Sequence, residues 1–559
     1  MNLHKFIIFP FAILLFSLAS ANTLDEIGSE ILEQIWNFHP VDATYLGIHK
    51  YDTLLPEYSK NSLKKMLSRF KKLRQNVDEL DTLSFSVDEL VDYHLLKIDL
   101  ADEIFDLEIM KSYGKNPLIY VTGCIHSMYA ILIRSAPSTG AKINAIKKRL
   151  DQIPGFLKNA KQNLKHPPQI LCEIGIDQLD EGEELIEDIF STYKDSISEN
   201  EKKGFQQTKA RAIAAMKLFA MWLEKNGDSN SAYTLGQENY EYMLTHIHLL
   251  DINADSLLNL GKNVLDSTNR MIDSLENLLQ EPERQSIALP PDFGKNDVMA
   301  YRKQEIDFMR NYVAKSNLVT VPDWIGKLEV VETPGFLRTI IPSIAMQPSG
   351  PFDDSNTSYF YVKPLPDEFE LSQAEYYYNY IQNHWFRSSI VHEGYPGHHL
   401  QLSIANRHLS IIRKSFYDNF FIEGWALYCE ELMVHSGIYK DTLGAIINAL
   451  RGVRFRAVRI IIDVMLQTRQ YSYEDAVNFM VTTLKGNPIF YAREVKRYIT
   501  DPGQASSYLV GKLQILDLLD DYKKAMADKF ILKNFHDELI SHGSIPIKLI
   551  RRIMMSEIK

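Results

Sequence analysis

The chain contains very little cysteine. Only three of its 559 residues are cysteines, namely Cys124, Cys172 and Cys429. Three cysteines are too few for a disulfide framework, and an odd number of them cannot all pair within the chain. Cys124 and Cys172 could pair in an oxidising compartment, but burial as small apolar side chains is at least as good an interpretation. Stability must therefore come from a hydrophobic core, which a chain of this length with 45% hydrophobic residues can supply.

Clustered positive charge is also lacking. The formal net charge is −11, and no basic stripe stands out among the lysines and arginines. Because proteins that bind nucleic acid carry such a stripe, we do not expect a nucleic-acid partner. Low-complexity tracts and convincing internal repeats are absent as well.

The N-terminus lacks an apolar run long enough to span a membrane comfortably, which takes roughly 20 residues. Lys5, the apolar residues 6–18 and the small residues 19–21 are together typical of a secretory signal peptide. A retained anchor is the less favoured alternative, and a lipid-anchored lipoprotein is not expected because no cysteine follows the apolar core. We expect cleavage after Ala21 and a periplasmic or secreted protein with no stable membrane insertion.

Helical periodicity dominates the rest of the chain. From residue 23 to about 279, apolar residues recur at three- and four-residue spacing with charges between them. A segment rich in proline and glycine, Glu281 to Asp297, then interrupts the pattern. We therefore predict an N-terminal helical lobe over residues 22–280 and a C-terminal lobe over 281–559, forming one two-lobed unit.

One short region predicts β-structure. Three runs rich in β-branched and aromatic residues, separated by proline and glycine, cover Lys327 to Val331, Thr339 to Ile344 and Ser358 to Val362. The last run is a candidate edge strand that could pair with an extended peptide, although a purely structural strand is nearly as good an interpretation. Ser372 to Glu375 then has the pattern of a capping box that starts a long helix. The predicted fold is mostly α, with a small sheet beside the segment that follows.

That segment carries the chemistry. His392-Glu393-Gly-Tyr-Pro-Gly-His398-His399 places three imidazoles and a carboxylate within eight residues, and Glu423 opens a helical-looking run further on. Two histidines and a later glutamate are the ligands of a catalytic zinc site, which leaves a fourth position open for water. The sequence therefore predicts a zinc hydrolase, and most simply a peptidase.

The spacing departs from the usual zinc helix, in which the two histidines stand at i and i+4. On a regular helix His398, at i+6, would lie about 240° around the axis from His392 and ~9 Å along it. Pro396 would clash with the carbonyl group four residues earlier, so the helix must bulge or break there. A two-residue bulge would return His398 to the position of the second ligand. We therefore favour His398 over His399, and the other histidine would support the site or contact substrate.

The glutamates divide into different roles. Glu393 is adjacent to the first ligand and should not coordinate the metal; in such sites this residue takes the proton of the activated water. Glu423 is the best candidate for the third ligand. Glu430 and Glu431 are two turns further along the same predicted helix, so we expect them to support the ligands or to face solvent.

Three segments together resemble a known family. His392 to Gln401, Glu423 to Tyr428 and Pro502 to Gly511 are similar to the bacterial "domain of unknown function 885" family, over nearly the whole mature chain. That family resembles a branch of the zinc metallopeptidases with a deep cleft between helical lobes. The resemblance implies His392, His398 and Glu423 as zinc ligands, Glu393 as base, and Tyr508 as a donor to the oxyanion.

A further stripe of charged residues is interpreted as structural. Arg456, Arg459 and Asp463 lie on one helical face, and we favour a buried Arg–Asp brace over a catalytic role. In the resembling family a histidine often follows this aspartate four residues on, where this chain has Gln467. If that histidine stabilises the transition state, this protein must use another group or work less well.

We therefore expect an exported zinc (Zn²⁺) peptidase that cleaves short peptides. The alternatives are a zinc hydrolase of a non-peptide amide and a catalytically silent metal- or peptide-binding protein. The sequence leaves open exo- or endopeptidase action, side-chain preference and oligomeric state. Zinc over manganese or cobalt is inferred from the ligand types.

Overall fold

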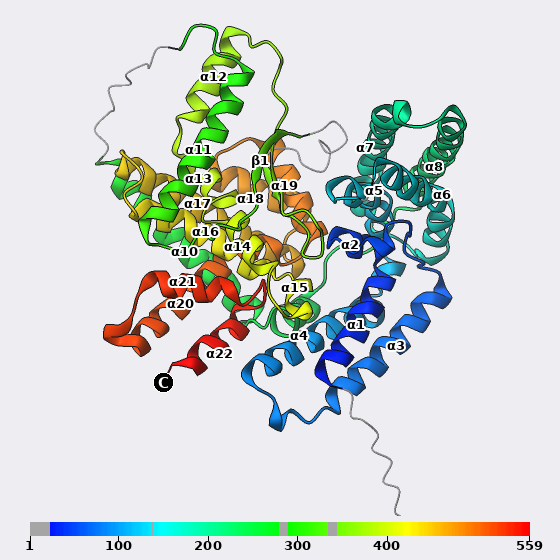
Figure 1. The fold of residues 1–559 in the computed structure, drawn as a ribbon, viewed down its shortest axis with the longest axis horizontal. Helices are drawn as coiled ribbons and strands as arrows, with labels where there is room; N and C mark the ends of the chain where they lie inside the picture. Colours follow the sequence, from blue (N-terminus) through cyan, green and yellow to red (C-terminus); the bar gives the residue numbers. More distant parts are fainter. Residues whose placement is uncertain (1–22, 137, 279–288, 334–343, 559) are drawn as a thin grey trace, which may run out of the picture.

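The computed structural model describes residues 23–136, 138–278, 289–333 and 344–558, and helices dominate these ranges (Figure 1). The predicted signal peptide, residues 1–21, lies outside them. The helices of the first half are α1 (Leu24–Phe38), α2 (Pro40–Tyr45), α3 (Lys60–Asp78), α4 (Val87–Ile104), α5 (Leu118–Ile133), α6 (Thr139–Asn163), α7 (Gln169–Tyr193), α8 (Glu199–Asn226), α9 (Gln237–Tyr242) and α10 (Ala254–Glu276).

The second half holds a small sheet and twelve further helices among the described residues. The strands are β1 (Leu328–Glu332), β2 (Ala345–Gln347) and β3 (Ser358–Val362). The helices are α11 (Lys295–Ser316), α12 (Leu371–Ile381), α13 (His384–Glu393), α14 (His398–Ala405), α15 (Ile411–Ser415), α16 (Asn419–His435), α17 (Thr442–Gln467), α18 (Tyr473–Leu484), α19 (Pro488–Thr500), α20 (Gln504–Met526), α21 (Leu532–Ser541) and α22 (Ile547–Glu557). The prediction of a mostly α fold with a small sheet is confirmed.

Many of the N-terminal helices begin at a residue whose side chain caps the helix, namely α1, α3, α4, α6, α8 and α10. The hydroxyl of Thr23 accepts a hydrogen bond from the backbone of Glu26, whose carboxylate accepts one from the Thr23 backbone in return. Cys124 on α5 and Cys172 on α7 are both buried and free. Their interpretation as small core residues is therefore confirmed, and a disulfide between them is excluded.

The two halves of the chain are interleaved rather than simply consecutive. Helix α10 packs along α17, and the Gly261 backbone comes so close to Ile460 that an added Cβ would lie 2.9 Å from its side chain. The prediction assigned α10 to the N-terminal lobe, whereas its apolar face belongs to the core around α17. In the opposite direction, the buried Arg413 on α15 bonds Asp88 and Asp92 on α4.

The strand order is β1-β3-β2, with β1 parallel and β2 antiparallel to β3. The strands predicted at Lys327 to Val331 and Ser358 to Val362 are confirmed within one residue. Most of the run predicted at Thr339 to Ile344 lies outside the described residues, and β2 begins just after it. The edge-strand prediction for Ser358 to Val362 is wrong, because β3 is the central strand and is paired on both sides. Among the residues that the structure describes, the outer edges of the sheet are β1 and β2.

Helix α12 also begins differently from its prediction. Its N-cap is Glu370, whose backbone N–H donates to the side chain of Gln373 at 3.0 Å. Ser372 is already inside the helix, so the predicted capping box is out of register. The helix is short as well, because it ends at Ile381 and α13 starts afresh with the side chain of Asn383 as its cap.

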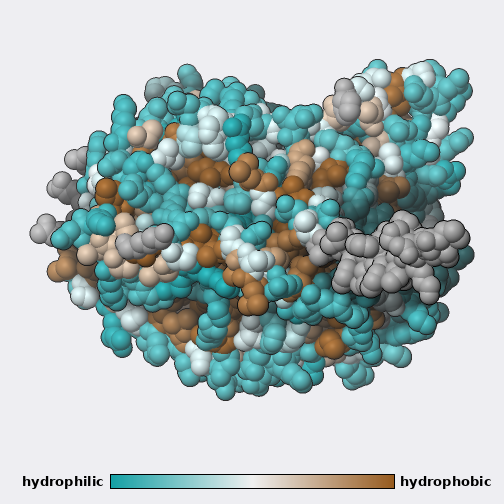
Figure 2. Space-filling view, turned by 60° about the horizontal axis from the view of Figure 1, so that its bottom comes forward, coloured by the Kyte–Doolittle hydropathy of each residue, from teal (hydrophilic) through white to brown (hydrophobic). Residues whose placement is uncertain are grey.

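One face of the protein is mostly hydrophilic, with hydrophobic residues gathered in bands across its middle (Figure 2). Within the described ranges, no single helix is both long and apolar enough to cross a membrane. One sharply bent pair, Val87–Gly114 with Leu118–Ile133, passes by length and composition alone.

Candidate metal centre

The motif His392 to His399 forms two helices joined by a short turn. Helix α13 ends at Glu393, where the N–H of Gly394 makes the last helical bond to Ile390 at 2.9 Å. Helix α14 begins at His398. The sequence predicted a two-residue bulge, but the helix is completely broken here. A proline inside a helix can kink it or break it, and in this protein the helix is broken.

Two residues, Gly397 and Trp425, hold this turn in place. A Cβ atom on Gly397 would lie 2.0 Å from the carbonyl oxygen of His392, so only glycine fits there. The buried indole of Trp425 on α16 donates a hydrogen bond to the carbonyl of Pro396 at 2.9 Å. The segment beginning at Glu423 therefore clamps the turn from the neighbouring helix.

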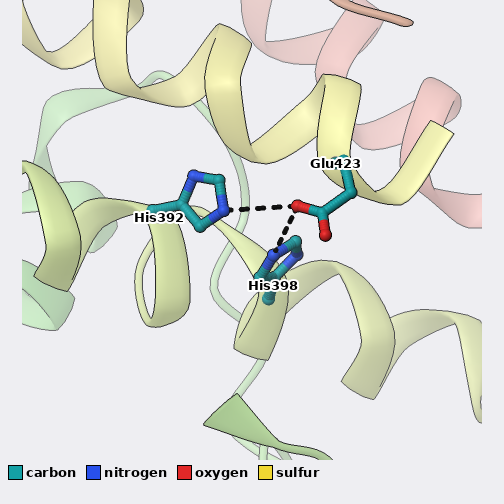
Figure 3. Close-up of side chains that lie close together, drawn as sticks. All are labelled: His392, His398 and Glu423. Atoms are coloured by element: carbon teal, nitrogen blue, oxygen red, sulfur yellow. Dashed lines mark ion pairs between the residues drawn. The ribbon is translucent and has the colours of Figure 1, made fainter. Parts of the chain in front are cut away.

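The break brings His392, His398 and Glu423 together, as Figure 3 shows. Both imidazoles direct Nε2 toward one carboxylate oxygen of Glu423, at 3.4 Å from His392 and 3.3 Å from His398. One candidate ligand atom from each residue lies within 4.8 Å of the others. Three elements, α13, α14 and α16, thus contribute one donor each to a single point.

The ring of His392 is oriented from behind by Glu430. Its Nδ1 lies 2.9 Å from Glu430 Oε1, and Glu430 also bonds Ser388 and Arg456. Because Nδ1 bonds Glu430, Nε2 is the nitrogen left to bind a cation beside Glu423. Burial by itself would lower the pKa of His392, but the hydrogen bonds with Glu423 and Glu430 raise it to about 10. The centre therefore favours positive charge.

His399 points away from this centre. Its ring is buried, with Nε2 3.1 Å from the carbonyl oxygen of Gly326, next to β1. Burial lowers the pKa of His399 to about 4, so the ring is neutral at pH 7. Of the two histidines between which the sequence leaves a choice, the structure brings His398 to Glu423 and leaves His399 supporting the strand region.

The donor set fits zinc. Two imidazole nitrogens and a carboxylate oxygen are the protein ligands of many catalytic zinc sites. The buried Oε2 of Glu423 has no hydrogen-bond partner in the described part of the chain beyond its ion pairs with His392 and His398. Despite burial, these imidazoles hold the pKa of Glu423 well below its usual range, so the oxygen is ionised and available to a cation.

Glu393 lies at the edge of the centre, one residue after His392. Its carboxylate accepts a hydrogen bond from the backbone N–H of Met346 at 3.1 Å. Met346 is the middle residue of β2, a free edge of the sheet. Sequence reasoning gave no signal for this contact, because it joins residues 47 positions apart.

Tyr508 closes another side of the centre. Its ring stacks beside His392 with centroids 6.2 Å apart, and the Arg459 guanidinium lies 4.8 Å from the Tyr508 centroid. The side-chain amide of Gln504 donates to the Tyr508 hydroxyl at 3.0 Å and lies 3.4 Å from Glu423. Burial and the charge of Glu423 raise the pKa of Tyr508, which keeps the phenol protonated. Gln504 was missed as a site residue, although it stands inside the motif Pro502 to Gly511.

Two glycines let α16 and α20 approach closely enough to bring Tyr508 beside Glu423. A Cβ on Gly424 would lie 2.5 Å from the backbone of Gly511, and one on Gly511 would lie 1.7 Å from the carbonyl oxygen of Phe420. Backbone atoms cannot move aside as a flexible side chain can. Gly424, which follows Glu423, and Gly511, which ends the Tyr508 motif, therefore lie in contact where α16 crosses α20.

Gly511→Ala is expected to destabilise the protein by at least about 3 kcal/mol, the upper part of the range for overpacking, because the added methyl meets backbone. Thermal unfolding followed by circular dichroism measures the loss. Gly155→Ala on α6 is the matched control, since nothing lies within 4 Å of the Cβ it would add. Equal melting temperatures for the two variants would show that the crossing is looser than the structure indicates.

The predicted Arg–Asp brace is wrong, although all three of its residues are buried. Arg456 bonds Glu430 at 3.2 Å and Arg459 bonds Glu494 at 2.7 Å. Asp463 faces the start of α20 instead. It accepts hydrogen bonds from the Tyr240 hydroxyl, the Gly503 N–H and the Ser506 hydroxyl. Arg456 is thus connected to His392 through Glu430, and Arg459 contacts the Tyr508 ring. Asp463 holds the start of the motif that carries Tyr508.

Glu494→Gln should reduce stability at neutral pH by on the order of 3 kcal/mol. Burial would raise the pKa of Glu494, but Arg459 and Arg497 lower it to about 2. A carboxyl with a depressed folded pKa stabilises the protein above its unfolded pKa and loses that contribution as pH falls toward 2. The gap in melting temperature between wild type and variant should therefore narrow from pH 7 to pH 3. The exposed Glu474→Gln should show no such gap at either pH.

Gln467 has a structural role. Its side-chain oxygen accepts from the Leu235 N–H at 3.1 Å, and its amide donates to the Tyr498 carbonyl at 3.3 Å. The side chain is buried and binds backbone on two other segments. The position where a family histidine was expected is thus filled by a residue that ties the segment before α9 to α17 and α19.

The fold and site define a mostly helical protein with a centre of two histidines and one glutamate. The chain belongs to the family described as "Bacterial protein of unknown function (DUF885)", which it matches over residues 40–554. This confirms the family predicted from the sequence. No curated protein that was compared matches the chain.

Two solved structures share the fold. One is that of a "putative lipoprotein of unknown function" from Shewanella oneidensis, with 23% identity and a TM-score of 0.76, covering 96% of this chain and 100% of the other. The second is that of a "putative lipoprotein" from Colwellia psychrerythraea, with 17% identity and a TM-score of 0.75, covering 96% and 99%. At these identities the similarity establishes the architecture alone.

Proposed function

We propose that this protein is a zinc-dependent peptidase that hydrolyses short peptides. The observation that carries the proposal is the convergence of His392 Nε2, His398 Nε2 and Glu423 on one point, with Glu393 beside them. A bound zinc ion would polarise the scissile carbonyl and lower the pKa of a water molecule to about 7. These residues are the donors that would hold it.

Glu393 is the general base in this proposal. It follows His392 directly, and its carboxylate would accept a proton from the attacking water and pass it to the leaving amine. The N–H of Met346 supports one carboxylate oxygen, Oε2, so the other is the one available to the water. The proton transfer therefore needs no other base.

Tyr508 is the proposed donor to the oxyanion. Because its pKa is raised, the phenol keeps its proton at neutral pH and can donate a hydrogen bond to oxygen as charge develops there. Gln504 supports this role by donating to the same hydroxyl, which leaves the phenolic proton free to point elsewhere.

The substrate backbone would pair with β2 rather than with β3. Strand β3 is central, whereas β2 is a free edge and its Met346 N–H already points to Glu393. An extended peptide that adds to this edge would lie beside the centre.

Export is part of the proposal. The sequence has the pattern of a signal peptide, and both structural relatives are described as lipoproteins. We expect the mature protein in the periplasm or outside the cell.

The test is cleavage of a mixed peptide library, read by mass spectrometry, with the purified mature protein. Cleavage should stop when a chelator removes the metal and return when one equivalent of zinc is added. Cut positions would distinguish exo- from endopeptidase action. Absence of cleavage with one zinc bound per chain would refute the peptidase, as would cleavage that persists in metal-free protein verified by elemental analysis.

A further inference from the structure

A cavity of about 390 Å³ is lined by residues close in sequence to those of the proposed reaction centre, among them Leu402 on α14 and Tyr417 just before α16. Its walls come mainly from α2, the loop after β2, α14, α15 and the segment just before α16, with Arg134 and Ser544 completing them. The lining is largely apolar or aromatic, and includes Tyr45, Pro348, Pro351, Leu402, Ala405 and Tyr417. The volume falls within the range of about 300–1,000 Å³ that is typical of ligand pockets.

Two backbone connections link this cavity to the centre. Leu402 is four residues after His398 on α14, so the two side chains share one face of that helix. Pro348 is two residues after Met346, whose N–H binds Glu393. The same strand edge that would hold a substrate backbone therefore runs into the cavity wall.

Tyr417 supplies a third connection. It stands six residues before Glu423, and 57% of its side chain is exposed. Tyr417 lines the cavity, and the segment that carries it leads directly into α16, which supplies Glu423.

The charged groups of the lining are mostly engaged elsewhere. Arg413 is buried and bonds two aspartates of α4. Arg134 donates to the Pro348 carbonyl at 2.7 Å and stacks on the Tyr45 ring, whose hydroxyl is bonded to Gln347. Asn406 donates to the Ser349 carbonyl at 2.8 Å. Asp42 and Lys414 also line the cavity, and the Lys414 ammonium lies over the Phe352 ring. Most of the surface left to an occupant is therefore aromatic and aliphatic.

We propose that this cavity is a specificity pocket for a large apolar side chain, aromatic or aliphatic, on a residue flanking the scissile bond. The inference rests on the proposed peptidase function. It adds a substrate class, namely peptides with an apolar residue next to the cleaved bond. Burial of that side chain against Leu402, Ala405 and Tyr417 would hold the peptide in register with Glu393.

The experiment uses a hexapeptide series in which one residue on either side of the cleaved bond is Phe, Leu, Ala, Asp or Lys. At one of the two positions, kcat/KM for Phe or Leu should exceed that for Ala by at least about 10-fold, as apolar pockets discriminate by size. Ala405→Phe, which fills the cavity, should reduce this ratio to about 2-fold or less. Tyr417→Ala removes a largely exposed wall, so it spares the core and should reduce the ratio as well.

A binding measurement separates this inference from the proposed function. Calorimetric titration of the zinc-loaded Glu393→Gln variant with the Phe and Ala peptides reports on the pocket without turnover. Tighter binding of the Phe peptide that Ala405→Phe abolishes would support the pocket, even if the wild type cleaves nothing. Cleavage with no apolar preference at either position would overturn the pocket and leave the peptidase intact. Equal binding of Phe and Ala peptides would overturn it too.

Discussion

Replacing Glu393 by glutamine is expected to lower kcat/KM for peptide cleavage by roughly 1,000-fold, within the range that a general base contributes. The amide keeps the size of the side chain and can still accept the hydrogen bond that Met346 donates at 3.1 Å. It cannot accept the proton of the attacking water. Because Glu393 supplies none of the three converging donor atoms, zinc stoichiometry should stay at one per chain. Steady-state kinetics and elemental analysis measure the two quantities.

Glu368→Gln is the matched control for this substitution. Glu368 is an exposed glutamate before α12, so the same chemical change there should leave both quantities within experimental error. If Glu393→Gln kept more than about a tenth of wild-type activity, another group would be the base, since a lost base costs at least about 100-fold. If zinc were lost instead, Glu393 would have to be counted among the ligands.

The sequence predicts the composition of the centre better than its local shape. Pro396 made an interrupted helix necessary, because its ring excludes the carbonyl four residues earlier. It did not determine whether the interruption would be a bulge or a break. That outcome depends on Trp425, which bonds the Pro396 carbonyl from α16, and on Gly397, which allows the close contact with His392. The contact of Trp425 joins segments that are distant in sequence, and the spacing of apolar residues along the chain does not predict such contacts.

Pairing across the sheet shows the same limit. The composition of Ser358 to Val362 indicated a strand, but strand order depends on which neighbours reach it. The short strand β2, only three residues long, covers one side of it and becomes the free edge. In the same way, Arg459 and Asp463 were correctly expected to be buried, yet their partners on α19 and α20 could not be inferred from one helical face.

The supporting residues were partly accessible from the sequence. Glu430 was expected either to support the ligands or to face solvent, and the structure has it against His392 at 2.9 Å. Met346 carried no distinguishing signal, and Gln504 had only its place in the motif Pro502 to Gly511, because a methionine in a strand and a glutamine at the start of a helix usually have structural roles. Their importance follows only from the distances to Tyr508 and Glu393.

Replacing His398 by alanine is expected to weaken zinc binding by more than about 100-fold, because supporting residues alone cost 10–100-fold and a ligand should cost more. Activity should be lost with the metal. His399→Gln should keep zinc affinity within about 10-fold, since Nε2 of His399 faces the Gly326 carbonyl and the ring lies outside the triad. Competition with a zinc chelator measures both affinities, and circular dichroism establishes that each variant is folded.

The pair of variants is informative because the two histidines are adjacent and both buried. Loss of a buried ring costs stability in either case, so an effect through folding alone would weaken zinc binding in both variants to a similar degree. A direct ligand gives a strongly unequal result. If His399→Gln lost zinc and His398→Ala kept it, the metal would have to bind at a point other than the one on which His392, His398 and Glu423 converge, and the assignment of Glu423 as third ligand would fall with it. Retention of zinc by both would mean that neither ring is a ligand, and the peptidase proposal would lose the observation on which it rests.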